Sequence, residues 1–308
     1  MHADTPGDRM ELSSFPIIGI ALAVLSAALL TVGNHLQSVG VERASRGSST
    51  SLGAAGFWAL ARTPVWLLGS VLFGLAILAQ LAALAFAPLI VVQPVGVIAL
   101  VFASALTAVV TRRRPSSAEI VAILVAVASL AAFVGVAAAV SVQTTITDRE
   151  LILILIILLV VLTVTFAGLA LLRRHGIPPV VYVVLGGLFA GFVATLGKTV
   201  ILRVQTAWAS RDFSIDDTNL LTIACLVGIA VAGALSIYFV QTAHTVSNPQ
   251  TVVAGLTIVD PFVAVILGIT VLGEAVGAPL WSFGVFAVAG AGAMWAVWRL
   301  ASITQPSR

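Results

Sequence analysis

Charged residues are scarce in this sequence: Asp, Glu, Lys and Arg together make up 9% of its 308 residues. Soluble globular domains carry roughly 25% charged residues. Hydrophobic residues make up 60% of the chain, and the mean hydropathy is +1.15. This composition excludes a soluble domain and predicts an all-α polytopic membrane protein in contact with membrane lipid.

Cysteine and the common catalytic motifs are also nearly absent. Cys225 is the single cysteine, so no internal disulfide can form, and no Cys/His spacing suggests a zinc site. Glycine-rich phosphate loops, Walker sequences, a G-x-S-x-G elbow and H-E-x-x-H are missing from the chain. We therefore expect a protein that is not an enzyme and needs no cofactor. Without an ATPase domain, any active transport would use a gradient.

Apolar runs of spanning length predict nine transmembrane helices separated by short polar connections. The predicted spans are about Phe15–Gln37, Val65–Phe86, Leu89–Val110, Ala118–Val140, Leu151–Leu172, Pro179–Ile201, Leu220–Thr242, Gln250–Leu272 and Pro279–Leu300. The segment Leu52–Ala61 is ambiguous, since it can be an interfacial or re-entrant helix instead of a span. If it crosses the membrane, the count becomes ten and the N-terminus moves to the inside.

The arginines between these spans indicate the orientation of the chain. With nine spans, one face of the membrane holds Arg43, Arg46, Arg62, Arg112, Arg113, Arg114, Arg173, Arg174, Arg299 and Arg308, and the other holds Arg9, Arg149, Arg203 and Arg211. Loops rich in Lys and Arg stay in the cytoplasm, so we expect the N-terminus outside and the C-terminus inside a cell (inner or plasma) membrane. Because the excess positive charge reports topology, it does not suggest a nucleic-acid partner.

An acid and a proline, Asp260-Pro261, interrupt the apolar stretch Asn248–Glu274 close to its middle. As a helix this stretch spans about 40 Å, more than the ~30 Å hydrocarbon core of a bilayer. A carboxylate at that depth is costly unless it has a partner, a cavity or a proton, so it is a functional candidate by default. Pro261 also removes a backbone donor and frees a carbonyl of the preceding turn.

A faint internal repeat predicts two related, inverted halves. Ala87-Pro88 resembles Asn248-Pro249, and in a competing register Gln93-Pro94 matches Asp260-Pro261. Both registers predict an interrupted helix at corresponding places in the two halves, a feature of transporters with a binding site at the membrane midplane. The expected divisions are a polar tail at 1–13, a first repeat short by one helix at 14–145, a second repeat at 150–301, and a tail at 302–308.

Polar residues within the spans are the candidate ligands for a substrate or an ion. They are Asp260, Gln93, Asn34, Gln80, Gln241, Asn248 and Lys198. Each uncharged residue alone is more often a hydrogen-bonding partner between helices than a ligand, but several lie near the proline-containing helices. Asp260 is the strongest candidate and the one metal ligand that we assign.

Two further charges have a simpler interpretation. Lys198 lies about three residues from the predicted outer end of its span at Ile201, so we expect its ammonium group to reach the membrane surface rather than to pair with Asp260. A position near the substrate path is the minority interpretation. Glu274 ends the predicted eighth span, and we expect a solvated acid at the outer surface.

Several segments resemble the NIPA-type magnesium-transporter branch of the drug/metabolite transporter superfamily. Residues 67–106 (LLGSVLFGLAILAQLAALAFAPLIVVQPVGVIALVFASAL) resemble W-x-G…A-Y-A-F-A-P…V-T-P-L-G-A-L-S-V of that branch. WALARTPVWLLG resembles L-R-x-P-L-W-W-x-G, and GFVATLGKTVILRVQ resembles V-S-C-V-K-G, with Lys198 on the matching lysine. VDPFVAVILGITVLGE is similar to the P-x-x-A…L-G-E helix of EamA-type members. Gln93 stands where the branch has threonine, and Asp260 where it is usually uncharged.

This resemblance implies a secondary carrier that moves a small solute by alternating access, with a divalent cation such as magnesium as the first candidate. Asp260 and the carbonyls freed at Pro261 would supply hard oxygen ligands. The resemblance is also compatible with a homodimer. The alternatives are an exporter of an organic metabolite, drug or lipid-linked sugar, and a non-transporting scaffold of the cell envelope. A wide apolar cavity would favour the exporter. A scaffold would lack a polar central cavity and would pack Asp260 against a donor.

Overall fold

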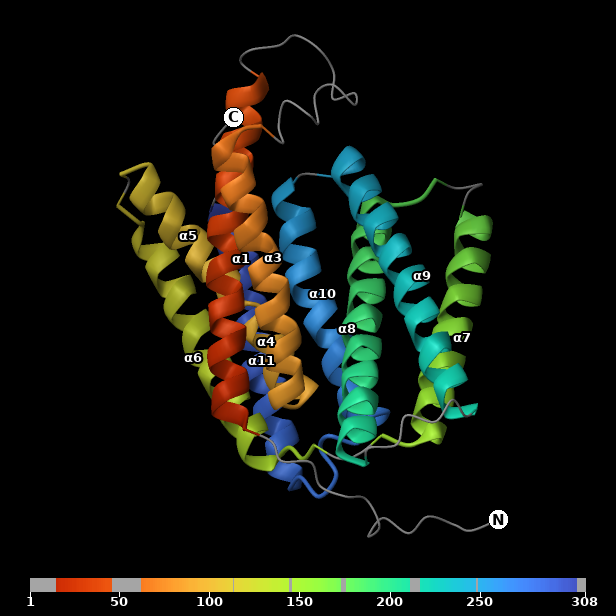
Figure 1. The fold of residues 1–308 in the computed structure, drawn as a ribbon. Helices are drawn as coiled ribbons and strands as arrows, with labels where there is room; N and C mark the ends of the chain where they lie inside the picture. The colour runs from red at the N-terminus through yellow and green to blue at the C-terminus, as the bar shows by residue number, and fades with distance from the viewer. Residues whose placement is uncertain are drawn as a thin grey trace.

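The computed structural model describes residues 15–45, 62–112, 114–143, 146–172, 176–210, 217–247 and 249–303, which form helices and short connections without any strand. The helices are α1 (Pro16–Ser45), α3 (Pro64–Phe86), α4 (Leu89–Val95), α5 (Ile98–Val110), α6 (Ser117–Val140), α7 (Asp148–Leu172), α8 (Pro179–Ser210), α9 (Asp217–Val246), α10 (Pro249–Thr270) and α11 (Leu280–Ile303) (Figure 1). With α4 and α5 taken together, nine helical segments within the described ranges are long and apolar enough to cross a membrane. The predicted all-α polytopic fold is confirmed. The ambiguous segment Leu52–Ala61 lies outside the described residues.

Helix starts follow from the local sequence. Pro64 and Pro179 stand at the first positions of α3 and α8, where the missing N–H would have no helical partner in any case. Ser116 caps α6, because its hydroxyl accepts a hydrogen bond from the Glu119 amide at 3.2 Å. Apolar sequence then carries each helix across the membrane.

The predicted third span is divided into α4 and α5. Pro94 lies inside α4 and cannot donate to the preceding turn. The chain then passes through Gly96 and Val97, whose amides bond the carbonyls of Gln93 and Pro94. In contrast, α10 continues through Pro261 as one helix to Thr270. The prediction of two interrupted helices is therefore wrong for α10, which tolerates the lost hydrogen bond without breaking.

The sixth predicted span was too short, because α8 does not end near Ile201 but continues to Ser210. Polar groups in this extension have partners: Arg203 forms an ion pair with Asp148, and Gln205 donates to the Ala85 carbonyl at 2.8 Å. These contacts allow the helix to extend beyond its apolar run. The extension places Lys198 well inside α8.

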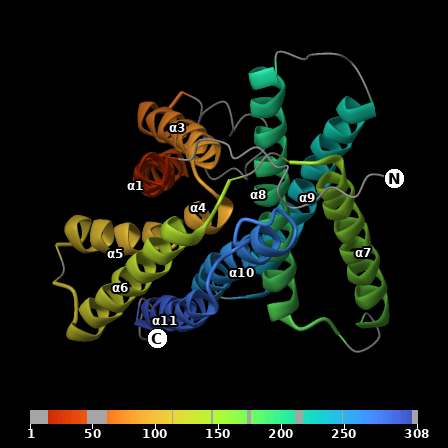
Figure 2. The same ribbon diagram turned by 90° about the horizontal axis from the view of Figure 1, so that it is seen from below.

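The short helix α4 lies at the centre of the arrangement. It contacts α1, α6 and α10, and the view along the helices in Figure 2 shows it between them. Around it, α1 packs along α3, α6 along α11, and α8 along both α9 and α10.

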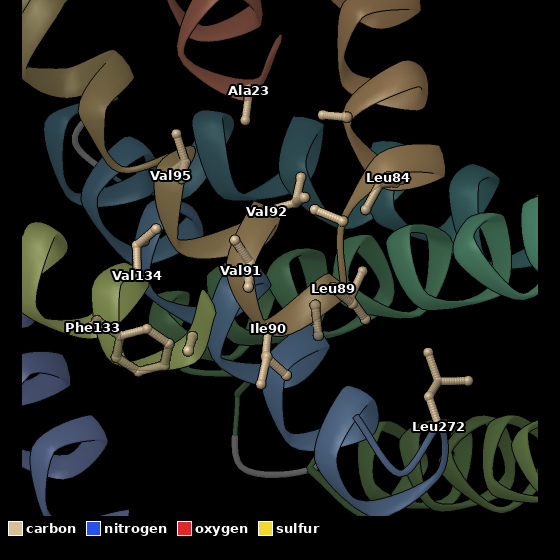
Figure 3. Close-up of a cluster of buried hydrophobic side chains, with 14 of the residues drawn as sticks. Ala23, Leu84, Leu89, Ile90, Val91, Val92, Val95, Phe133, Val134 and Leu272 are labelled. Carbon is tan, nitrogen blue, oxygen red and sulfur yellow. The ribbon is translucent and has the colours of Figure 1, made fainter. Parts of the chain in front are cut away.

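Side chains of α4 form the middle of the largest apolar cluster (Figure 3). Residues Leu89 to Val92 are fully buried, with neighbours that include Phe133 and Val134 of α6 and Leu84 of α3. A helix that is apolar on all sides is expected to be buried in protein. The α4 segment therefore forms a packed barrier within the span.

Candidate functional site

A cavity of about 670 Å³ lies between α1, α3, α4, α5 and α10. Most of its lining is apolar, with small residues such as Ala27, Ala76 and Ala99. Its polar lining residues are Ser26, Thr31, Asn34, His35, Ser38, Gln80, Gln93, Thr107, Thr257 and Asp260. Asp260 is the one acid among them. A concave site with few polar groups in an apolar wall is typical of a small-ligand pocket.

The cavity approaches one end of the bundle. Its α1 lining extends from Ala23 to Ser38, and its α5 lining reaches Thr107. Ser38 and Thr107 are exposed, whereas Ala23 and Gln93 at the opposite end are buried. The open end is the upper end in Figure 1, where α1 ends and α10 begins. The cavity therefore stops at α4.

Asp260 lines this cavity, and one of its carboxylate oxygens has no hydrogen-bond partner among the described residues. This oxygen, Oδ1, is buried. A buried carboxylate without a donor is costly, and one within a membrane span costs several kcal/mol unless a cation, a proton or water compensates it. No donor among the described residues contacts Oδ1, so the Asp260 carboxylate needs a compensating group that a ligand in the cavity could supply.

Other oxygen atoms lie on the same stretch of α10. Because Pro261 has no N–H, the Thr257 carbonyl cannot accept the usual hydrogen bond from four residues ahead. Thr257 lines the cavity, and its hydroxyl donates to the Val253 carbonyl at 2.7 Å. The side chains of Asn34, Gln80 and Gln93 make no hydrogen bond within the described residues. Their amide oxygens remain available to a ligand.

Glycines of α8 hold the Asp260 segment in place by close packing. A Cβ atom on Gly187 would lie 2.7 Å from Val259 Cβ, and one on Gly191 would lie 2.7 Å from Val263 Cβ. The Gly191 Cβ would also lie 3.0 Å from the Asp260 carbonyl oxygen. Only glycine permits this approach of the two helices.

Gly191→Ala is expected to destabilise the protein by about 1–3 kcal/mol, because an added methyl group must displace α10. Gly197 of the same helix is the matched control, since nothing lies within 4 Å of a Cβ placed there. Gly197→Ala should be neutral or stabilising by up to about 1 kcal/mol, the helix-propensity gain. Thermal unfolding of the two variants in detergent measures the difference, and equal stability would contradict this packing.

The structure brings four of the predicted site residues into one cavity: Asp260, Gln93, Asn34 and Gln80. Gln241 is exposed on α9 and does not line this cavity. Asn248 lies outside the described residues. Four of the seven candidates, from three different parts of the sequence, therefore converge.

Lys198 is not at the membrane surface, so the expectation that it extends there is wrong. It is fully buried, and its ammonium group donates to the backbone carbonyls of Leu84 and Ala87 and to Gln143. It is also absent from the cavity lining. The prediction failed because the helix that carries it ends well beyond Ile201.

The expectation of a solvated acid at Glu274 is also wrong. Glu274 is 3% exposed, and its two carboxylate oxygens accept hydrogen bonds from the amides of Leu89 and Ile90 at 2.7 and 2.8 Å. The chain turns back after α10 and carries the carboxylate into the protein. Nothing in the sequence near Glu274 indicates a partner in α4.

Sequence reasoning missed several lining residues on α1. Ser26, Thr31 and Ser38 were missed, and together with the predicted Asn34 they follow one another at helical intervals of three to five residues and lie on the cavity. Such a polar stripe on an otherwise apolar helix indicates a face turned toward protein or water. This spacing was a usable signal. However, the hydroxyl groups of Ser and Thr commonly donate a hydrogen bond to a backbone carbonyl of their own helix, as the Thr31 hydroxyl does to the Ala27 carbonyl at 2.8 Å.

The site suits a hydrated cation better than a naked one. No group of three or more His, Cys, Asp or Glu side chains that could hold a metal ion occurs in the described part of the chain. Mg²⁺ loses water reluctantly and is often bound through one or two carboxylates while it keeps several waters. One carboxylate, nearby amide oxygens and a wide cavity match that mode of binding.

Comparison with known families gives one match. The family model described as "Magnesium transporter NIPA" matches residues 15–275, a stretch that includes the whole cavity and Glu274. No curated protein and no solved structure matches the chain.

Proposed function

The chain belongs to the NIPA magnesium-transporter family, within the EamA-like drug/metabolite transporter superfamily, and on that premise we propose that it is a secondary carrier of Mg²⁺. The ion would bind in the cavity beside Asp260 and cross by alternating access. Membership in a transporter family and nine apolar helices within the described residues make it a multi-pass membrane protein.

The observation that carries this proposal is that Asp260 lines the cavity while its buried Oδ1 has no hydrogen-bond partner among the described residues. A scaffold protein would be expected to pack this carboxylate against a donor and to lack a polar cavity. The described residues show the opposite on both counts. A carboxylate oxygen that has no partner among the described residues is suited to a cation that is bound and then released.

Hydrated Mg²⁺ fits the arrangement of oxygens around Asp260. The carboxylate would accept hydrogen bonds from the waters of the ion or replace one of them, and the amide oxygens of Asn34, Gln80 and Gln93 would accept from other waters. Partial retention of water explains how one carboxylate can serve a dication. Such binding is weaker than a closed cage of ligands, and a carrier must release its cargo.

The transport cycle would alternate between two openings of the same cavity. The open end lies on the side of Arg43, Arg62, Arg112 and Arg299, which the distribution of arginines assigns to the cytoplasm. The structure thus corresponds to a state open to the cytoplasm in this proposal. The two halves, 14–145 and 150–301, contribute α1, α3, α4 and α5 on one side and α10 on the other, so their relative motion would open the opposite end.

Mg²⁺ influx into liposomes that contain the purified protein tests this function, with a fluorescent magnesium indicator trapped inside. We expect influx above that of protein-free liposomes. Cobalt(III) hexaammine, whose ligands do not exchange, should inhibit this influx because it mimics the size and charge pattern of a hydrated cation. Influx that cobalt(III) hexaammine leaves unchanged would contradict a hydrated ion, and absent influx would contradict the magnesium assignment.

One observation favours a second candidate, an exporter of a small organic solute. The cavity volume of about 670 Å³ falls within the range typical of small-molecule sites, and its wall is mostly apolar. Asp260 would then bind a cationic group of the solute or exchange a proton. Stabilisation of the purified protein by organic cations, with none by Mg²⁺, would select this candidate.

A further inference from the structure

The α3–α4 junction (Phe86, Ala87 and Pro88) is a break in the helix that lies inside the protein. A helix end leaves its last carbonyls and its first amides without helical partners. Within a membrane such irregular backbone is tolerated only where the protein itself satisfies it. The Ala87 amide donates to the Ala83 carbonyl, and the Pro88 carbonyl accepts from the Val91 and Val92 amides. The other polar groups of the two helix ends need partners from elsewhere in the chain.

Lys198 of α8 satisfies two of the carbonyls. Its Nζ atom donates to the Ala87 carbonyl at 2.8 Å, to Gln143 Oε1 at 3.1 Å, and at short range to the Leu84 carbonyl. All three protons of the ammonium group thus have acceptors. The positive charge sits at the carboxyl end of α3, which is the negative end of the helix dipole.

The neighbouring carbonyls of the junction have partners as well. Gln205 Nε2 donates to the Ala85 carbonyl at 2.8 Å, and the Phe15 amide donates to the Phe86 carbonyl at 2.9 Å. Residues from α8 and from the start of α1 therefore complete the end of α3.

Glu274 satisfies the other side of the junction. It accepts from the first two amides of α4, those of Leu89 and Ile90, with one carboxylate oxygen on each. A negative charge at the amino end of a helix complements the dipole there. Two buried charges of opposite sign thus hold the two helix ends from opposite sides.

The α3–α4 junction, with Lys198 and Glu274 bound to it, lies at the closed end of the cavity. The lining stops at Gln93, four residues after Leu89 on the same short helix. Leu89 to Val92, fully buried, separate the cavity from the far side. Whatever fixes the start of α4 therefore fixes both the barrier and the position of Gln93.

We infer that Lys198 and Glu274 are positioning residues that keep α4 in place as the gate on the side opposite the cavity opening. The inference rests on the proposed transport function and assigns to these two residues a role separate from substrate binding. Opening the far side requires α4 to leave Glu274 while Lys198 holds the end of α3 in place, so the strength of these contacts sets how often the gate opens.

Accessibility of one cavity position from the two membrane faces tests this gate. In a Cys225→Ala background the chain has no cysteine, and Ala99→Cys then places one thiol on the cavity wall. A membrane-impermeant maleimide should label it readily from the open face and slowly from the other. Glu274→Gln keeps the shape of the side chain but removes its charge, so labelling from the closed face should rise about tenfold, as expected when a minor conformation gains population.

Asp148→Asn is the matched control, because it breaks the ion pair of Asp148 with Arg203 on α8 without touching the junction. Its labelling should equal that of the parent. Unchanged labelling in a folded Glu274→Gln protein would overturn the inference and leave Glu274 as a structural cap. No cargo is added in this experiment, so its outcome is separate from the identity of the substrate.

A disulfide provides a second test, in which one variant is compared with itself in its oxidised and reduced states. A Cβ atom on Gly268 would lie 3.5 Å from Leu89 Cβ, within the range of disulfide-bonded cysteines. The pair Leu89→Cys and Gly268→Cys should stop transport when oxidised and restore it when reduced, since the bond ties α4 to α10. Equal transport in both redox states would overturn the gate.

Discussion

Asp260→Asn is expected to abolish most Mg²⁺ transport while the protein remains folded. The substitution keeps the size of the side chain but removes the one acidic group that lines the cavity. Loss of one partner of a desolvated charge pair costs about 2 kcal/mol or more, which corresponds to roughly 30-fold weaker ion binding. Influx into liposomes at an ion concentration below saturation should fall by a similar factor.

Gln241→Leu is the control for this variant, because Gln241 is a polar residue of a span that does not line the cavity. Its influx should match that of the parent protein. Parental influx in Asp260→Asn would show that the ion does not use this carboxylate.

The stability of Asp260→Asn separates a functional role from a structural one. In the described structure the carboxylate loses its hydration and gains no hydrogen bond at Oδ1. Removing its charge should therefore leave stability unchanged or raise it by about 1 kcal/mol, as is common when an active-site charge is neutralised. If the Asp260 carboxylate instead held the fold together through a hydrogen bond or an ion pair, Asp260→Asn would lower the stability of the protein.

Lys198→Met is expected to cause the largest loss of stability of any variant considered. It leaves the carbonyls of Leu84 and Ala87 without their donor and the buried Glu274 without an opposite charge. Each buried polar group left without its partner typically costs about 1–3 kcal/mol, so the two carbonyls together cost about 2–6 kcal/mol. Unfolding in detergent should show the effect as a lower midpoint than that of the parent.

A double-mutant cycle with Glu274→Gln checks the coupling of these two charges. The double variant should be more stable than the sum of the two single losses predicts, since the second substitution removes a charge that the first leaves uncompensated. Asp148→Asn, which breaks a partly exposed ion pair, should cost only about 0–1 kcal/mol. Strictly additive losses at Lys198 and Glu274 would show that the two charges act independently.

The sequence was sufficient to find the helices and part of the cavity, because the membrane makes polar residues within apolar runs costly. Asp260, Gln93, Asn34 and Gln80 were selected for that reason, and all four line one cavity. Gln241 met the same criterion but is exposed on α9. Composition within a span does not reveal which face of a helix turns toward the interior.

Lys198 and Glu274 show why the rest could not be predicted. Their partners are backbone atoms of α3 and α4, more than a hundred residues away, and backbone atoms leave no signature in a sequence. The depth of Lys198 was misjudged because the apolar run ends near Ile201 while α8 continues to Ser210. Pro88 and Pro94 indicated the helix breaks on either side of α4, because proline cannot donate a backbone hydrogen bond. The same inference from Pro261 predicted a break in α10, which instead continues through Pro261 as one helix.

The central claim is that Asp260 binds the transported Mg²⁺, and the effect of Mg²⁺ on thermal unfolding tests it most directly. A ligand that binds the folded state raises its stability by about 2.7 kcal/mol at a concentration of 100 times its dissociation constant. We expect Mg²⁺ to raise the unfolding temperature of the parent protein in a saturable manner, with little or no rise in Asp260→Asn. An equal rise in both proteins, or none in the parent at any concentration, would contradict the claim.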